Sequence, residues 1–168
     1  MKKIHEVLQI DVWKHWMKVE NFTNFNFRSD IRNPLPKDLT WYLAEIEEED
    51  LNQLFIISSG DWADISDGTF RVLDVVSRLN LRSDNPDTQR IANDIHKKVE
   101  FLNTGRKLDT QLIAVTNSPD LDGPFTIIEG NRCSVALCVC TAIVGCQIFI
   151  GTSSDIINYK WAKKSYFI

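Results

Sequence analysis

Short apolar runs alternate with turn signals through residues 111–151, and this alternation restricts the chain to a fold that mixes helices and strands. Gln111 to Thr116, Phe125 to Glu129 and Gln147 to Gly151 each have the length and apolar character of a strand. Between the last two lies a nearly all-apolar stretch, Cys133 to about Val144, which predicts a buried helix. We therefore expect an α/β (α+β) domain, with a small mixed sheet and packed helices.

The preceding part of the chain adds one strand and several helices to this expectation. Trp41 to Ile46 is rich in aromatic and apolar residues, as strands are. Ile4 to Val19 and Phe70 to Leu79 have broadly helical spacing. Thr88 to Asn103 is the clearest amphipathic helix, and its apolar stripe consists of Ile91, Ile95, Val99 and Leu102.

An acidic run and an asparagine-rich segment complete this part. Glu47 to Asp50 suits the first turn of a helix, whose N-terminus carries partial positive charge, and we expect that helix to continue through Leu51, Leu54 and Phe55. Residues 21–36 predict a loop that ends at the breaker Asn33 to Pro36. Three phenylalanines would attach this loop to the domain: Phe22, Phe25 and Phe27.

A chain of 168 residues is long enough for one domain. We expect a single domain over 1–168, in which residues 41–151 form the core. Residues 1–36 would be an N-terminal helix and loop appendage, and residues 152–168 a C-terminal helix or tail, with Ser153 or Ser154 as its cap.

The composition excludes several classes of protein. Hydrophobic residues make up 43% and charged residues 25%, so the chain has enough apolar surface to fold. A net charge of -4 argues against a protein that coats nucleic acid without sequence preference. The most apolar window, Val135 to Ile150, is too short and too polar to span a bilayer, and no signal-peptide-like stretch precedes it. We expect a soluble cytoplasmic protein without a membrane partner.

The four cysteines lie close together and suggest neither zinc nor disulfides. Cys133, Cys138, Cys140 and Cys146 contain no Cys-x-x-Cys pair, and the histidines are distant in sequence. We expect Cys138, Cys140 and Cys146 to be buried, reduced and unpaired. Cys133 differs because a helix N-terminus and a neighbouring arginine can depress the pKa of a thiol.

The segment with the most chemical content is the junction Glu129-Gly130-Asn131-Arg132. An apolar strand ends in an acid, glycine permits a tight turn, and a helix begins at once. The unpaired N–H groups of a first helical turn favour anions, and the Arg132 guanidinium suits phosphate. Glu129 could take a proton or hold a metal ion. A strand-glycine-helix junction also arises for purely structural reasons, and Arg132 would then pair with Glu129 or a buried carboxylate.

The same residues resemble the core motif of the ParB/sulfiredoxin-like superfamily. Pro124 to Arg132 followed by Ser134 to Leu137 matches its apolar strand, acid, glycine, arginine and helix. The resemblance implies that fold and a nucleotide site formed by Gly130, Asn131, Arg132, Cys133 and Ser134. It further implies Glu129 and Arg132 as catalytic residues and Glu129 as the metal ligand, with Mg²⁺ bound together with the nucleotide.

Two departures from that motif limit the chemistry. Asn131 stands where sulfiredoxins carry their catalytic cysteine, which argues against sulfiredoxin activity. ParB-type members usually have arginine at the positions of both Arg132 and Cys133, and here only Arg132 remains. Losing the second guanidinium removes a bidentate phosphate contact.

These observations favour a nucleotide- or phosphate-binding protein with phosphohydrolase or nuclease-like activity. The alternative is a catalytically inactive binding or regulatory module of the same fold, which could be DNA-associated. Only residues 152–168 follow the motif domain, too few for the helix-turn-helix of a partition factor. Two basic clusters could contact nucleic acid, although solvated helix ends explain them as well: Lys97, Lys98, Arg106 and Lys107; and Lys160, Lys163 and Lys164. The oligomeric state stays open.

Overall fold

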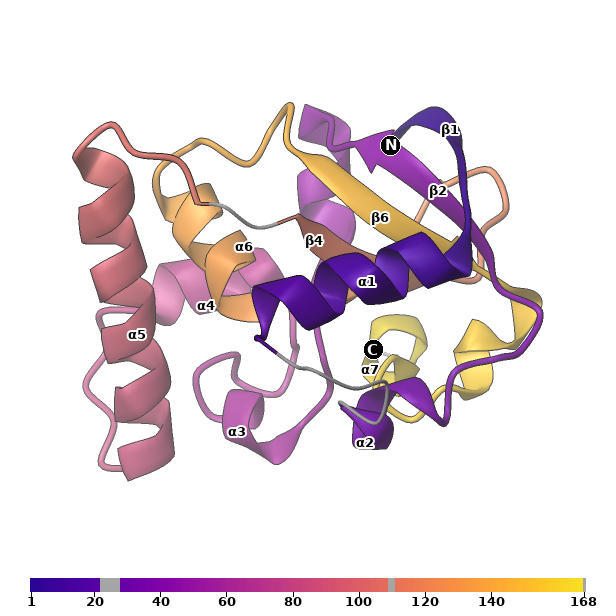
Figure 1. Ribbon diagram of the computed structural model, residues 1–168. Helices are drawn as coiled ribbons and strands as arrows, with labels where there is room; N and C mark the ends of the chain where they lie inside the picture. Colours follow the sequence, from indigo (N-terminus) through magenta and orange to yellow (C-terminus); the bar gives the residue numbers. More distant parts are fainter. Residues whose placement is uncertain (22–27, 109–110, 168) are drawn as a thin grey trace.

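The computed structural model describes residues 1–21, 28–108 and 111–167 (Figure 1). Within these ranges six strands form one mixed sheet in the order β1-β2-β6-β4-β5-β3. The pairs β4–β6 and β3–β5 are parallel, and the other neighbours are antiparallel. The strands are β1 (Lys2–Val7), β2 (Thr40–Glu45), β3 (Leu54–Ile56), β4 (Leu112–Thr116), β5 (Phe125–Glu129) and β6 (Gln147–Thr152).

The predicted mixed sheet with packed helices is therefore confirmed. All four expected strands are present, within a residue of the expected ends. β4 lies between β5 and β6 and is buried along its whole length, which explains why residues 112–116 are apolar without alternation.

Two expected helices are wrong in part, because strands occupy some of their residues. Ile4 lies in β1, an exposed edge strand that pairs antiparallel with β2, and the helix α1 (Gln9–Val19) begins only after it. The acidic run forms the first turn of a 3₁₀ segment, η1 (Glu48–Gln53), and the buried strand β3 follows directly and contains Leu54 and Phe55. Each of these strands pairs with a neighbour in the sheet, and this pairing rather than local periodicity decides its structure.

The remaining helices lie around the sheet. They are α2 (Ser29–Arg32), α3 (Gly60–Ala63), α4 (Val72–Arg78), α5 (Pro86–Asn103), α6 (Asn131–Val139), α7 (Lys163–Tyr166) and the 3₁₀ segment η2 (Ser154–Asn158). Ser153 caps η2 as expected, accepting a hydrogen bond from Asp155 N at 3.1 Å. Residues 28–36 contain α2 within the expected loop, and the three phenylalanines of that loop lie outside the described residues.

Helix α1 covers one face of the sheet, and α4, α5 and α6 gather beside it (Figure 1). The buried residues of α1 are Val12, Trp13 and Trp16, and the ring centres of Trp13 and Trp41 lie 5.3 Å apart. Aromatic side chains remove large apolar areas from water, so this contact fixes α1 on the sheet.

Helix α5 follows its sequence pattern closely. Asn85 caps it, accepting a hydrogen bond from Asp87 N at 2.9 Å, and Pro86 occupies the first helical position. Ile91 and Ile95 of the apolar stripe are buried. The helix packs against α6 and stands beside it in Figure 1.

Helix α6 is shorter than the sequence predicts. It ends at Val139, and a turn follows through residues 140–146. The four cysteines are unpaired, as expected. The predicted burial of Cys138, Cys140 and Cys146 is wrong, because all three are partly exposed near the end of α6. Burial of its sulfur nevertheless raises the pKa of Cys138 to about 12.

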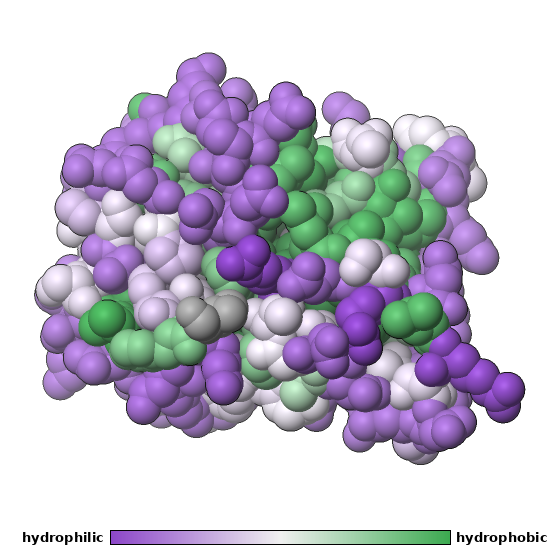
Figure 2. Space-filling view, turned by 180° about the vertical axis from the view of Figure 1, so that it is seen from behind, coloured by the Kyte–Doolittle hydropathy of each residue, from purple (hydrophilic) through white to green (hydrophobic). Residues whose placement is uncertain are grey.

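The surface is largely polar. Figure 2 shows that the face opposite to Figure 1 is mostly hydrophilic, with one contiguous apolar area on the right of the view. Throughout the described ranges, none of the helices has both the length and the apolar character needed to cross a membrane.

Candidate functional site

The sheet topology places the segment Glu129-Gly130-Asn131-Arg132 and the loop after β3 at the same edge of the sheet. Strands β3 and β5 are parallel, so their carboxyl ends reach the same edge of the sheet. Glu129 ends β5 and α6 follows at Asn131, while Ile57 and Ser59 follow β3. In open sheets, ligands bind in the crevice outside the carboxyl ends of such strands.

Gly130 makes the sharp turn between β5 and α6. Its φ is +86°, in the left-handed region that side chains rarely adopt. A Cβ at this position would lie 2.5 Å from Leu112 Cδ2 of the neighbouring strand β4. Both observations require glycine here, and the expected strand-glycine-helix junction is present.

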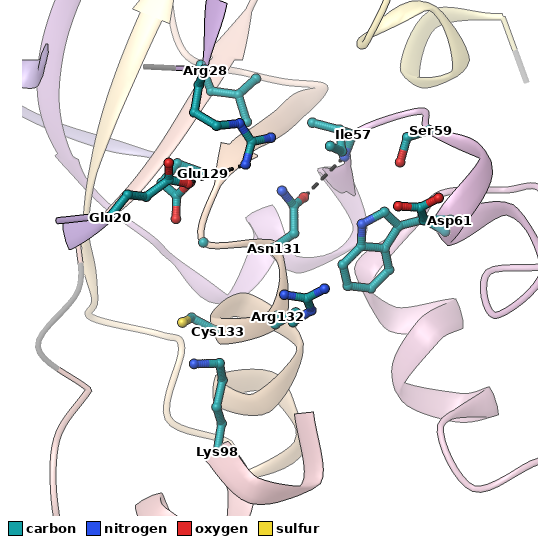
Figure 3. A pocket seen from close by; sticks show the side chains of 13 residues that line it. Glu20, Arg28, Ile57, Ser59, Asp61, Lys98, Glu129, Asn131, Arg132 and Cys133 are labelled. Atoms are coloured by element: carbon teal, nitrogen blue, oxygen red, sulfur yellow. Dashed lines mark hydrogen bonds and ion pairs between the residues drawn. The ribbon is translucent and has the colours of Figure 1, made fainter. Parts of the chain in front are cut away.

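A cavity of about 290 Å³ opens at this turn (Figure 3). Its walls come from the end of α1, the residue before α2, the loop after β3, α5 and the start of α6. Three cationic side chains line it: Arg28, Lys98 and Arg132. Five of the residues singled out from the sequence line this cavity: Glu129, Gly130, Asn131, Arg132 and Cys133.

The first turn of α6 faces this cavity with its backbone donors. The hydrogen bond from Ser134 N to Gly130 O, at 2.8 Å, is the first of the helical ladder. The amides of Asn131, Arg132 and Cys133 precede that ladder, so the helix itself does not use them. An anion at this end of α6 would also be stabilised by the helix dipole.

Asn131 holds the loop after β3 against α6. Its Oδ1 accepts a hydrogen bond from Ile57 N at 3.1 Å (Figure 3). Ser134, the last of the expected binding residues, is buried and donates its hydroxyl to Asn131 O at 2.8 Å. Ser134 thus supports the turn, whereas the other four residues line the cavity.

Arg132 does not pair with Glu129. Its Nε lies 3.7 Å from Asp94 Oδ2 of α5, and both side chains are more than one third exposed. That nitrogen is itself shielded from solvent, and no hydrogen-bond acceptor within the described residues is in reach of it. The side chain as a whole is 38% exposed and lines the cavity, so its guanidinium is available to a ligand there.

Glu129 forms a carboxyl pair with Glu20 at the end of α1. Burial and the neighbouring Glu20 carboxyl raise the pKa of Glu129 to about 7. Two contacts moderate this effect: Trp16 Nε1 donates to Glu129 Oε2 at 2.9 Å, and Arg28 lies near both carboxyls. Arg28 NH1 is 3.3 Å from Glu20 Oε1 (Figure 3).

The surroundings of Cys133 do not activate its thiol. Burial raises the pKa of Cys133, and the opposing effects of Lys98 and Arg132 are smaller. The direction of this shift favours the interpretation of Cys133 as an unreactive, partly buried thiol over the alternative of a thiol activated by the helix N-terminus and Arg132.

Three carboxyl groups line the cavity, those of Glu20, Asp61 and Glu129. Among the residues that the structure describes, there is no group of three or more His, Cys, Asp or Glu side chains that could hold a metal ion. Mg²⁺ in nucleotide sites is held through one or two carboxylates and substrate phosphates. Glu129 in its ionised form, with Glu20 beside it, could supply this smaller set.

Sequence reasoning missed the residues that reach the cavity from a distance. Glu20 and Arg28 come from the segment expected to be an appendage, and Asp61 from helix α3. No sequence signal near these residues marks them. Lys98 is the exception, because it lies one turn from Asp94 on the clearly amphipathic α5, beside its apolar stripe.

Comparisons with known proteins identify neither a family nor a ligand for this chain. No protein-family model, curated protein or solved structure matches this chain.

Proposed function

We propose that this protein binds a nucleotide through its phosphate groups at the turn from Glu129 to Arg132, and that it acts as a phosphohydrolase or a nuclease-like enzyme. One observation carries the proposal. Cationic side chains from three parts of the chain line the same cavity as the first turn of α6. The resemblance of the motif to the ParB/sulfiredoxin-like superfamily supports the same conclusion.

The phosphate would sit against the start of α6. Amides of Asn131 to Cys133 and the Arg132 guanidinium would donate to its oxygens. Catalysis of phosphoryl transfer consists mostly of positioning and charge stabilisation, so these few donors supply most of what it needs. Gly130 allows the close approach because no side chain stands between the turn and the ligand.

Glu129 would act as the general acid–base group. General acid–base catalysis is most efficient when the pKa of the group lies near the working pH, and the pKa of Glu129 is about 7. In its ionised form Glu129 would accept a proton from the attacking water, and Glu20 would receive a hydrogen bond in turn. Mg²⁺ bound with the nucleotide would neutralise charge on the phosphates. Asn131 has no nucleophilic group, so a covalent sulfiredoxin-type step is not part of this proposal.

A binding module without catalysis is the second candidate. Cys133 contributes no positive charge where related motifs have an arginine, so charge stabilisation is weaker than in an active ParB-type site. Nucleotide affinity without turnover would favour this candidate over the enzyme.

The first test is the thermal stability of the purified protein with a panel of nucleotides. We expect at least one ribonucleoside triphosphate to raise the melting temperature in the presence of Mg²⁺. A ligand at about 100 times its Kd stabilises the folded state by about 2.7 kcal/mol. If no nucleotide and no inorganic phosphate raises the melting temperature at millimolar concentration, the proposed function is wrong.

A further inference from the structure

A second cavity, of about 410 Å³, adjoins the first along α5. The two cavities share the side chains of Lys98 and Arg132. The remaining walls of the second cavity come from Asp94, Lys97, Phe101 and Leu108. A ligand that reaches Arg132 from the turn can therefore continue into this second space without leaving the protein surface.

One face of α5 supplies most of this second cavity. Asp94, Lys97, Lys98 and Phe101 stand at spacings of three and four residues, so they lie along one side of the helix. This stripe runs beside the apolar stripe that packs into the core. The helix therefore presents a second, mixed face to the groove, with charge next to α6 and an aromatic ring further along.

The far end of the groove is suited to a flat apolar group. Phe101 and Leu108 are partly buried and form its apolar wall. The Arg106 guanidinium carbon lies 5.4 Å from the centre of the Phe101 ring. Aromatic rings and arginine planes are the groups on which nucleobases stack, and stacking tolerates any base.

The near end is suited to an anion. Arg132 Nε is shielded from water and lacks a hydrogen-bond acceptor among the described residues, while Asp94 Oδ2 is 3.7 Å away. The Arg132 side chain as a whole is 38% exposed and lines both cavities, so its guanidinium can donate to a ligand oxygen there. Lys97 and Lys98 add two more positive charges on the same wall.

We infer that this groove, lined by Asp94, Lys97, Lys98, Phe101, Leu108 and Arg132, holds the nucleoside part of a mononucleotide. The inference rests on the proposed function, because it takes the phosphate position at the turn as given. The phosphates lie at the start of α6, and the base lies against Phe101 and Leu108. Arg132 stands between them, where the two cavities meet. A volume of this size is within the range of small-molecule sites.

The test compares ligands that contain or lack the nucleoside. Affinities of inorganic tripolyphosphate, the four ribonucleoside triphosphates and a single-stranded oligonucleotide are measured by calorimetry on the same protein. We expect the best nucleotide to bind about 5- to 100-fold more tightly than tripolyphosphate, the scale of one base stacking on an aromatic side chain. Phe101→Ala should remove that advantage and leave the affinity for tripolyphosphate unchanged.

Two further variants keep the test decisive. Phe101→Leu retains apolar bulk if the alanine variant fails to fold, and it should still weaken nucleotide binding because the ring is lost. Phe167→Ala removes an exposed phenylalanine that is 66% accessible and lines neither cavity, so it should change nothing.

The outcomes separate the two proposals. If tripolyphosphate and all nucleotides bind equally well, the groove is not a nucleoside site, and the phosphate site alone survives. If the oligonucleotide binds far more tightly than any mononucleotide, the ligand is a nucleic acid strand and this inference is wrong. If none of these ligands binds, the proposed function fails, and the inference fails with it.

Discussion

The position of Glu129 at the candidate site could be predicted from the sequence, but its protonation could not. Its place at the end of an apolar strand, before a glycine, predicts an acid at the mouth of a site. Its protonation could not be predicted, because the partner carboxyl of Glu20 comes from a segment more than a hundred residues earlier. Burial and a second carboxyl depend on tertiary structure, and only the folded chain brings these two glutamates together.

The raised pKa of Glu129 predicts a specific dependence of stability on pH. In the unfolded chain the pKa of this glutamate has its ordinary value of 4.5, and in the folded protein it is about 7. Between these values the folded state retains a proton that the unfolded state releases. The contribution of Glu129 is therefore fully present below pH 4.5, and it is lost as the pH rises toward and through 7.

We expect the free energy of unfolding of the wild type to fall by about 1–3 kcal/mol from pH 5 to pH 8 relative to Glu129→Gln. The amide cannot ionise, so that variant loses this component of the pH dependence. Urea denaturation at several pH values measures the difference. Glu100→Gln, which changes an exposed glutamate of α5, is the control and should behave as the wild type does. Parallel curves for wild type and Glu129→Gln would show that Glu129 is ionised throughout.

At the scale of elements, the sequence predicts best where local pattern and tertiary environment agree. Helix α5 has a cap, a proline at its first position and a continuous apolar stripe, and its prediction holds. Strand β1 has two apolar residues, Ile4 and Val7, among polar ones and is exposed along most of its length, so nothing local distinguishes it from a helix start. Its pairing with β2 decides its structure. The same explanation applies to β3, which has three residues and pairs with β5.

The Asn131 side chain joins the loop after β3 to α6, and substitutions of it can separate an effect on stability from an effect on binding. Asn131→Ala removes the acceptor for Ile57 N, and we expect a loss of stability of about 1–3 kcal/mol, the cost of leaving a shielded amide unsatisfied. Asn131→Asp retains that acceptor but places a negative charge beside the phosphate position. We expect this variant to keep most of its stability and to lose nucleotide affinity.

Thermal melts and nucleotide titrations of both Asn131 variants test this pair of expectations. If Asn131→Asp binds nucleotides as tightly as the wild type does, no anion sits at the start of α6.

At the scale of the whole molecule, the site depends on parts of the chain that are far apart in sequence. The end of α1, the loop after β3, α5 and the β5–α6 turn each contribute side chains to the two cavities. The motif alone predicts the turn and its position at a strand end. It does not predict Glu20, Arg28 or the groove along α5, because these contacts follow from the packing of α1 and α5 around the sheet.

The most direct test of the whole account is the nucleotide affinity and the melting temperature of Arg132→Ala, measured together. Arg90→Ala, an exposed arginine of α5 that lines neither cavity, is the matched control. We expect Arg132→Ala to weaken nucleotide binding by about 1.5–3 kcal/mol, the scale of a charged hydrogen bond. Its melting temperature should change little, because the side chain is 38% exposed and its ion pair with Asp94, at 3.7 Å, is long. A variant that loses its stability, alongside a wild type without nucleotide affinity, would contradict the account and leave Arg132 as a structural residue.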